Sequence, residues 1–531
     1  MKNFEIAKNI EILTTLYKEL NTNYVDEIHA GELMTTSIEA MLESLDPYTN
    51  YIPESEVEDY RFMTTGKYGG IGSLIQKKDN YVIISEPYEG FPAQKAGLKA
   101  GDKILEINGE PAVGKNTEEV SNILKGQPGS KLNLLIEREG IDKDFEVELT
   151  RENIKIDNVT YYGMLDYRIG YIRLSSFTQN AWREFRNAFQ ELKKSNELNG
   201  LIIDLRGNGG GLLTESVNIA NLFIEKDELI VSTRGKLQDK NKVYKTQMQP
   251  IDTDVPIAVL VNGASASASE ILSGSMQDLD RGVIIGQRTY GKGLVQNVVP
   301  LSYNAKAKIT VAKYYIPSGR CIQAIDYSHK DENGNSEKVA DSLINEFRTR
   351  NNRIVYDGRG VKPDIVLEKQ ELSNIAFSLF VNNLIFDYAT KYTLQHDSIP
   401  EVEDFEITDE IYADFKKFIS DKDYDYTTDS EKALNKLKKS AKEEKYFDAI
   451  KGEYEALVEK IKHDKSEDLQ KFQDEIRELL KIEIAGRYYY QKGKIQASLK
   501  DDPEIEAAVK LLRNGERYKE ILSNPELTLK K

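Results

Sequence analysis

The sequence predicts a multidomain protein of mixed helix and strand, and its pattern changes three times along 531 residues. Apolar residues follow helical spacing over residues 4–64, and short apolar strands between glycine-rich turns fill residues 68–151. Strands then alternate with helices over residues 159–367, as in an α/β core, before long, charge-rich helical patterns begin. We therefore expect four units: a helical region at 1–66, a small β domain at 67–152, an α/β core at 153–369 and a helical, charge-rich domain at 370–531.

The N-terminal region is predicted to form two helices that act as an arm or an interaction element. Asp46–Pro47 ends the second helix, because the residue before a proline avoids helical backbone angles. The apolar residues at helical spacing are Ile6, Ile10, Leu13, Leu16, Tyr17 and Leu20 in the first helix and Leu33, Ile38, Met41, Leu42 and Leu45 in the second.

The composition excludes several classes of function. With 72 Lys and Arg against 88 Asp and Glu, the net charge is −16, which argues against a nucleic-acid surface because phosphate contacts need clustered basic residues. No stretch approaches the roughly 18 apolar residues of a membrane span, and the N-terminus shows no export signal. The single cysteine, Cys321, excludes an internal disulfide, and without a cysteine cluster or an HExxH motif we expect neither a metal nor a cofactor.

The stretch FPAQKAGLKAGDKILEINGEPAVG, residues 91–114, closely resembles the central part of a PDZ domain. PDZ domains add a chain terminus as a strand to a sheet edge, while backbone N–H groups capture the terminal carboxylate. The alternative is a glycine turn inside any small β domain. The resemblance implies that Ser73 to Ile75 is the edge strand and that the capture loop is Gly69, Gly70, Ile71 and Gly72.

Residues 260–296 carry the pattern expected of a nucleophile. Pro256 to Val261 reads as a buried strand, followed by a turn, a run of small residues and a helix. A serine at such a turn lies at the helix N-terminus, where free N–H groups favour developing negative charge. Chemistry alone does not separate the three candidates, Ser265, Ser267 and Ser269.

A serine nucleophile needs a base, and the sequence offers Lys292 between two glycines. No histidine lies between His29 and His329, so a local Ser–His pair is not available. Lowering a lysine pKa from about 10.4 to near 7 costs roughly 4–5 kcal/mol, which burial can supply. Candidate apolar walls are Val295, Ile284 and Ile285, and Gln296 shares one face of an extended segment with Lys292, where a neutral amide can orient the amine.

Together with DLRGNGGG upstream and YYIPSGRCIQ downstream, this passage resembles the carboxy-terminal processing proteases, also called tail-specific proteases. The resemblance covers about residues 10–370 and implies a ClpP/crotonase-like core. It also implies that Ser267 is the nucleophile, Lys292 the general base and Gln296 the assisting amide. Asp278 has been considered functional in that family, and we interpret it as mostly structural.

An oxyanion needs two N–H donors. One is expected to be the amide of Ala268, directly after the nucleophile. The other is expected in the glycine-rich turn at Gly209 or Gly210, with Gly210 favoured because family members often have proline at the position of Gly209. A phosphate-binding loop is the alternative for this turn, but the Lys–Ser/Thr ending of such loops is missing.

The leading hypothesis is a serine endopeptidase that recognises free, largely apolar C-terminal tails of protein substrates through its PDZ domain. A PDZ scaffold with an inactive core and an esterase or transacylase are the competing hypotheses. The resemblance implies the bacterial periplasm or cell envelope. The expected partners are protein or peptide substrates, with an adaptor or a second copy of the chain as further candidates.

Overall fold

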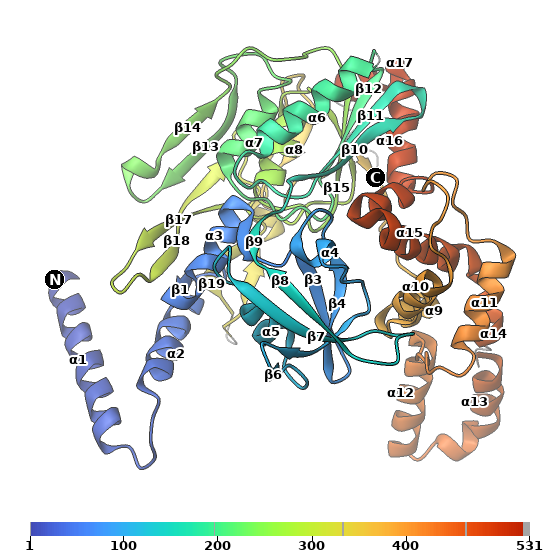
Figure 1. Cartoon of the computed structure of the whole chain (residues 1–531). Helices are drawn as coiled ribbons and strands as arrows, with labels where there is room; N and C mark the ends of the chain where they lie inside the picture. The colour runs from blue at the N-terminus through green and yellow to red at the C-terminus, as the bar shows by residue number, and fades with distance from the viewer. Residues whose placement is uncertain (1, 196, 332–333, 462–464, 524–531) are drawn as a thin grey trace.

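The structure, a computed structural model, describes residues 2–195, 197–331, 334–461 and 465–523 (Figure 1). Along the chain it passes from a helical arm to a β domain, an α/β core and a helical region, which is the predicted succession. No helix within these residues is long and apolar enough to cross a membrane.

One strand of the N-terminal arm belongs to a sheet of the α/β core. Its two long helices are followed by a turn in which the Asp46 carboxylate accepts hydrogen bonds from the amides of Tyr48 and Thr49, at 2.9 Å each. β1 then pairs with β18 of the core, so the arm is tied to the sheet that carries part of the candidate site. The elements are α1 (Lys2–Asn23), α2 (Ala30–Glu43), β1 (Asn50–Ile52), η1 (Glu54–Glu56) and α3 (Val57–Thr65).

The β domain is a sheet with strand order β3-β4-β5-β7-β8, in which β3 is an edge strand. The chain enters and leaves this domain through one antiparallel pair, β2 with β9. Alternate residues of its strands point into a small apolar core, which α5 covers. The elements are β2 (Lys67–Gly70), β3 (Ser73–Lys78), β4 (Tyr81–Pro87), α4 (Pro92–Lys95), β5 (Lys103–Ile107), β6 (Glu110–Pro111), α5 (Thr117–Leu124), β7 (Lys131–Glu137), β8 (Phe145–Thr150) and β9 (Glu152–Lys155).

The core contains a sheet with strand order β10-β11-β12-β15-β16-β23, parallel except for β10. Its central strands are buried on both faces, which explains their continuous apolar sequences. Three helices, α6, α7 and α8, cover one face. The elements are β10 (Val159–Leu165), η2 (Asp166–Arg168), β11 (Ile169–Leu174), α6 (Ala181–Ser195), β12 (Gly200–Asp204), α7 (Leu213–Ala220), β15 (Ile257–Val261), α8 (Ala268–Asp278), β16 (Val283–Gly286) and β23 (Ile365–Val366).

A second, antiparallel sheet in the order β1-β18-β13-β14, with β17 also on β18, joins the arm to the core. Its elements are β13 (Leu229–Gly235), β14 (Lys242–Lys245), β17 (Leu294–Pro300) and β18 (Lys306–Tyr315). Short elements complete this part of the chain: η3 (Gln238–Lys240), β19 (Ile325–Lys330), β20 (Ser336–Lys338), η4 (Asp341–Leu343), β21 (Glu346–Arg348) and β22 (Ile354–Tyr356).

The last two helices, α16 and α17, cover the second face of the core sheet (Figure 1). Ile505 and Leu511 of α16 and Ile521 of α17 pack against sheet residues such as Ile202 and Ile285. Helices α9, α10, α11, α14 and α15 form an apolar core of their own. The elements are α9 (Asn374–Val381), α10 (Leu384–Gln395), α11 (Asp409–Ile419), α12 (Asp429–Glu443), α13 (Phe447–Ile461), α14 (Lys465–Lys471), α15 (Gln473–Ala497), α16 (Pro503–Arg513) and α17 (Gly515–Ser523).

The helical region therefore packs on the α/β core. It also contacts the β domain, where Lys78 Nζ pairs with Asp387 Oδ1 at 2.5 Å.

Candidate active site

Ser267 lies at the turn between β15 and α8, where it is the N-cap residue of the helix. Its backbone has φ 56° and ψ −112°, a conformation that costs a non-glycine residue of the order of 1–3 kcal/mol. All residues of α8 are buried, whereas Ser267 is only half-buried. The strained turn thus presents one serine hydroxyl at the open end of a buried helix.

The three serines of the turn differ in what their hydroxyl groups do. Ser265 and Ser269 are fully buried, and their Oγ atoms donate to the carbonyls of Leu205 and Asn208, at 2.8 Å each. Ser267 Oγ, in contrast, donates no hydrogen bond within the described residues. The three hydroxyl groups thus differ in the hydrogen bonds that they donate, a difference that the residue types alone do not show.

Lys292 is half-buried between Gly291 and Gly293. Burial, followed by the positive charge of Lys308, lowers the pKa of Lys292 to about 8. Its Nζ lies 4.2 Å from the centroid of the Tyr48 ring, and the described residues include no hydrogen bond from Nζ to Ser267 Oγ. The lysine that the sequence predicts as the base thus reaches the same region as Ser267, in a position held by the N-terminal arm.

A buried carboxylate, Glu270, joins the two segments. It accepts hydrogen bonds from the amides of Ser267 (2.9 Å), Gly291 (2.7 Å) and Lys292 (2.9 Å), and from Thr289 Oγ1 (2.6 Å). Burial raises the pKa of Glu270 to about 6, although these hydrogen bonds oppose the shift. Sequence reasoning missed Glu270, but the pattern Ser267-Ala-Ser-Glu270 is that of a capping box and could have indicated it.

Gln296 forms its hydrogen bond with Thr310, across the β17–β18 hairpin, from Nε2 to Oγ1 at 3.2 Å. Thr310 Oγ1 in turn donates to Asp46, at 3.1 Å. The strand pairing shifts between Val295 and Gln296, so the simple alternation expected from Lys292 to Gln296 is interrupted by an irregularity. Gln296 is thus connected to the turn that carries Tyr48, next to the lysine.

The oxyanion donors expected from the sequence lie beside Ser267. A side-chain carbon at Gly210 would lie 2.9 Å from both Ala268 N and Ser267 Cβ, so only glycine fits there. The Gly210 amide donates to Asn208 Oδ1 at 2.8 Å, while the amides of Ala268 and Gly209 have no partner within the described residues. In this arrangement Gly209, the alternative that the sequence disfavoured, presents the free N–H.

The other residues singled out in the sequence include Asp278, Ile284 and Ile285, which are buried within the fold. Asp278 is buried and pairs with Arg320 at 2.8 Å, at the far end of α8 from Ser267. Ile284 and Ile285 belong to the apolar cores on the two opposite faces of the sheet. The ring next to Lys292 belongs to Tyr48, for which the sequence offered no local signal.

In the β domain, the predicted capture loop is divided between a strand and a turn. Gly69 and Gly70 are paired with Asn153 and Glu152 in the β2–β9 ribbon. Ile71 is buried, and the amides of Ile71 and Gly72 have no partner in the described part of the chain. The free amides therefore lie directly before the edge strand β3.

Three family models match successive parts of the chain. Residues 83–138 match a PDZ domain, residues 168–329 match peptidase family S41, and residues 375–512 match the C-terminal helical domain of a probable PDZ-protease. Fold and site thus define a serine-type peptidase with a PDZ domain, which confirms the predicted fold class.

Individual relatives point to one type of peptidase within this family. A carboxy-terminal-processing protease of Bartonella bacilliformis is 36% identical over 313 residues, covering 58% of this chain and 71% of the relative. The carboxy-terminal processing protease CtpA of Bacillus subtilis is 32% identical and covers 58% of this chain and 66% of the relative. The chain belongs to the carboxy-terminal processing proteases.

Among solved structures, a photosystem II D1 C-terminal processing protease is 28% identical, with a TM-score of 0.37, over 66% of this chain and 91% of its own. A PDZ domain of a carboxy-terminal protease from Vibrio cholerae, in complex with a peptide, is 35% identical, with a TM-score of 0.16, over 17% of this chain and 99% of its own.

Proposed function

We propose that the chain cleaves peptide bonds with Ser267 as nucleophile and Lys292 as general base. The observation that carries this proposal is that Ser267 is strained and half-exposed at the N-terminus of α8, and that its amide donates to the same carboxylate, Glu270, as the amide of Lys292. A lysine with a pKa of about 8 is partly neutral near neutral pH and is then able to accept a proton.

The reaction begins when the Lys292 side chain turns from the Tyr48 ring towards Ser267. Neutral Nζ takes the hydroxyl proton as Oγ attacks the carbonyl carbon, and the oxyanion is stabilised by the Ala268 amide and a glycine of the 209–210 turn. Protonated Nζ then gives the proton to the leaving amine. Water next attacks the acyl-enzyme as Nζ takes its proton, and Nζ returns a proton to Ser267 Oγ as the carboxylic acid product leaves. Gln296 supports the turn that holds Tyr48 next to the lysine.

The PDZ domain is proposed to capture the free C-terminal tail of the substrate. A tail added to the edge strand β3 ends at the free amides of Ile71 and Gly72, with Gly69 and Gly70 holding that turn in place. Ile71 is itself part of the apolar core of the domain, so apolar side chains lie next to these amides, which favours an apolar last residue.

Matched peptides test both parts of the proposal. The intact protein should cleave a peptide with a free, apolar C-terminus about ten- to hundredfold more efficiently than the C-terminal amide, because charge-assisted hydrogen bonds are worth roughly 1.5–3 kcal/mol. Mass spectrometry of the products identifies the bond that is cut. Equal cleavage of acid and amide would overturn tail capture, and cleavage by Ser267→Ala would overturn the nucleophile.

The proposed location is the bacterial periplasm or cell envelope, as the family resemblance implies. Fractionation of cells that express the full-length gene product tests it, and recovery with cytosolic markers would contradict it.

A further inference from the structure

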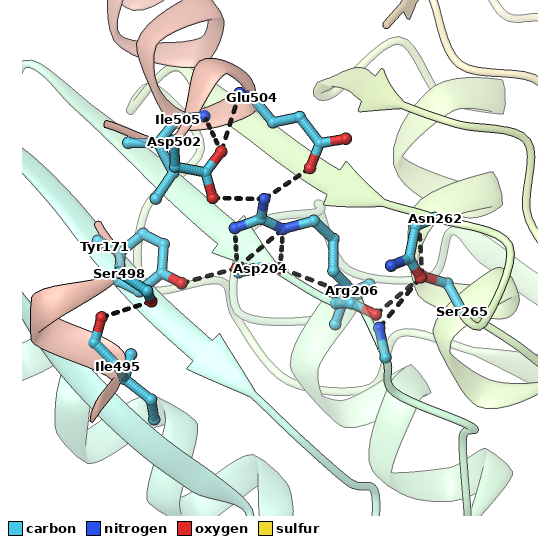
Figure 2. Close-up of polar contacts among 12 residues, drawn as sticks. Tyr171, Asp204, Arg206, Asn262, Ser265, Ile495, Ser498, Asp502, Glu504 and Ile505 are labelled. Atoms are coloured by element: carbon cyan, nitrogen blue, oxygen red, sulfur yellow. Dashed lines mark hydrogen bonds and ion pairs between the residues drawn. The ribbon is translucent and has the colours of Figure 1, made fainter. Parts of the chain in front are cut away.

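The first turn of α16 contacts the glycine-rich loop of the protease core through Arg206 (Figure 2). Arg206 Nη1 donates to Asp502 Oδ2 and to Glu504 Oε2, at 2.6 Å each. On its other side the guanidinium contacts Asp204 at the end of β12, with Nη2 at 2.7 Å from Oδ2. Arg206 is thus held between its own strand and the C-terminal helical domain, four residues before Gly210.

The two carboxylates of α16 are fixed by their own helix. Asp502 is the N-cap residue, and its Oδ1 accepts from the amides of Glu504 (2.9 Å) and Ile505 (3.1 Å). Ile505 is buried in the apolar core between α16 and the sheet. The position of the carboxylates is therefore set by helix packing, so they act as a fixed support for Arg206.

Glu504 also reaches a second loop of the site. While its Oε2 accepts from Arg206, its Oε1 accepts a short hydrogen bond from Gln287 Nε2. Gln287 follows β16 and lies five residues before Lys292. One carboxylate of the helical domain thus links the loop after β12, which carries Gly209 and Gly210, to the loop after β16, which carries Lys292.

The contact is largely shielded from water, which makes it sensitive to loss of charge. The side chains of Asp502 and Glu504 are 16% and 12% exposed, and that of Asp204 is fully buried. Charge-assisted hydrogen bonds in such surroundings are stronger than neutral ones and fix direction as well as distance. Loss of the negative charge on α16 would leave Arg206 held only by Asp204, on one side.

We propose that Asp502 and Glu504 are positioning residues for catalysis. Through Arg206 they hold the loop after β12, which carries the 209–210 turn, and through Gln287 Glu504 holds the loop after β16, which carries Lys292. The C-terminal helical domain is then part of the catalytic apparatus. This inference rests on the proposed roles of Lys292 and the 209–210 turn.

Three substitutions in the full chain test the proposal. Glu504→Gln and Asp502→Asn keep the size of each side chain, and asparagine is as good an N-cap residue as aspartate. Glu506→Gln is the matched control, because it removes one charge from the same helical turn at an exposed position. Activity is measured as kcat and KM on one tail peptide, and folding as the melting temperature.

We expect the double variant Asp502→Asn/Glu504→Gln to lose about ten- to hundredfold in kcat, as small displacements of catalytic groups do, with KM within twofold. Glu506→Gln should match the unmodified protein. The time course of labelling by a fluorophosphonate should show slower phosphonylation of Ser267, with loss of fluoride, in the double variant. A loss of folded protein alone would not cause this, since it lowers the amplitude and not the rate.

A double variant with the kcat and phosphonylation rate of Glu506→Gln would overturn the proposal, as would a loss explained wholly by a smaller folded fraction. If the double variant does not fold, the two single variants decide by the same criteria, since each leaves one carboxylate on Arg206. These outcomes are independent of the proposed chemistry, which fails only if Ser267→Ala or Lys292→Ala remains active.

Discussion

The amides of Ser267 and Lys292 donate to the same atom, Glu270 Oε2, at 2.9 Å each. The two residues are 25 positions apart in the sequence, and one buried carboxylate sets the distance between their backbones. This link holds whether the lysine side chain lies on Tyr48 or turns towards the serine. The backbone of the proposed dyad is thus preorganised, and the remaining freedom lies in the lysine side chain.

Replacement of Glu270 by glutamine should lower kcat about tenfold or more and leave KM nearly unchanged. A carboxamide has one acceptor oxygen and turns an NH2 group towards backbone N–H donors, so at least one amide loses its partner, at about 1–3 kcal/mol. Steady-state kinetics on a tail peptide measures the effect. Unchanged kcat in a folded Glu270→Gln variant would contradict the role of this link.

The same variant should change how stability depends on pH. The pKa of Glu270 is raised from 4.5 to about 6 in the folded protein, so folding favours the protonated form. Its contribution is fully present below pH 4.5 and is lost as the pH rises through about 6, an effect of about 2 kcal/mol. Urea unfolding at both pH values should show this loss for the unmodified protein relative to Glu270→Gln, and parallel curves would contradict the raised pKa.

The rate of cleavage should rise with pH as Lys292 loses its proton. Below its pKa of about 8, kcat/KM should increase about tenfold per pH unit and then level off. Lys292→Arg should be as inactive as Lys292→Ala, because arginine keeps its proton at any working pH. An active Lys292→Arg variant would show that the position supplies charge alone.

Three alanine substitutions should separate the serines of the nucleophile turn. Ser267→Ala should reduce kcat by at least about a thousandfold without loss of stability, as removal of a nucleophile does. Ser265→Ala and Ser269→Ala should retain the chemistry and lose about 1 kcal/mol of unfolding free energy each, since their hydroxyl groups bond to carbonyls. Covalent labelling by a fluorophosphonate, read by mass spectrometry, identifies the reactive residue.

Asp278→Asn should destabilise the fold and spare the chemistry. The change removes the charge that pairs with buried Arg320, which costs about 3–5 kcal/mol when one partner of such a pair is lost. Urea unfolding measures the loss, and kcat per folded molecule should stay within twofold. A selective loss of kcat would instead place Asp278 in the catalytic machinery.

The sequence was informative where a function depends on a local turn. The strand, the small residues and the helix around Ser267 are contiguous, and the PDZ and core patterns follow from short-range periodicity. Contacts between residues far apart in the sequence could not be predicted from local patterns. Tyr48 contacts Lys292 from an arm more than 200 residues away, and Glu504 contacts Arg206 from the C-terminal helices. The irregular strand pairing between Val295 and Gln296 likewise could not be predicted from simple alternation of side chains.

The packing of α16 and α17 on the core sheet also orders events during synthesis. The parallel strands of this sheet leave the ribosome long before residues 503–523, which cover their second face. Until then that face lacks the cover of α16 and α17, and the loops at Arg206 and Gln287 lack the carboxylate of Glu504, which contacts both. A nascent chain, or one cut short before α16, should therefore cleave its neighbours far more slowly, so that full proteolytic competence appears only after α16 has packed on the sheet.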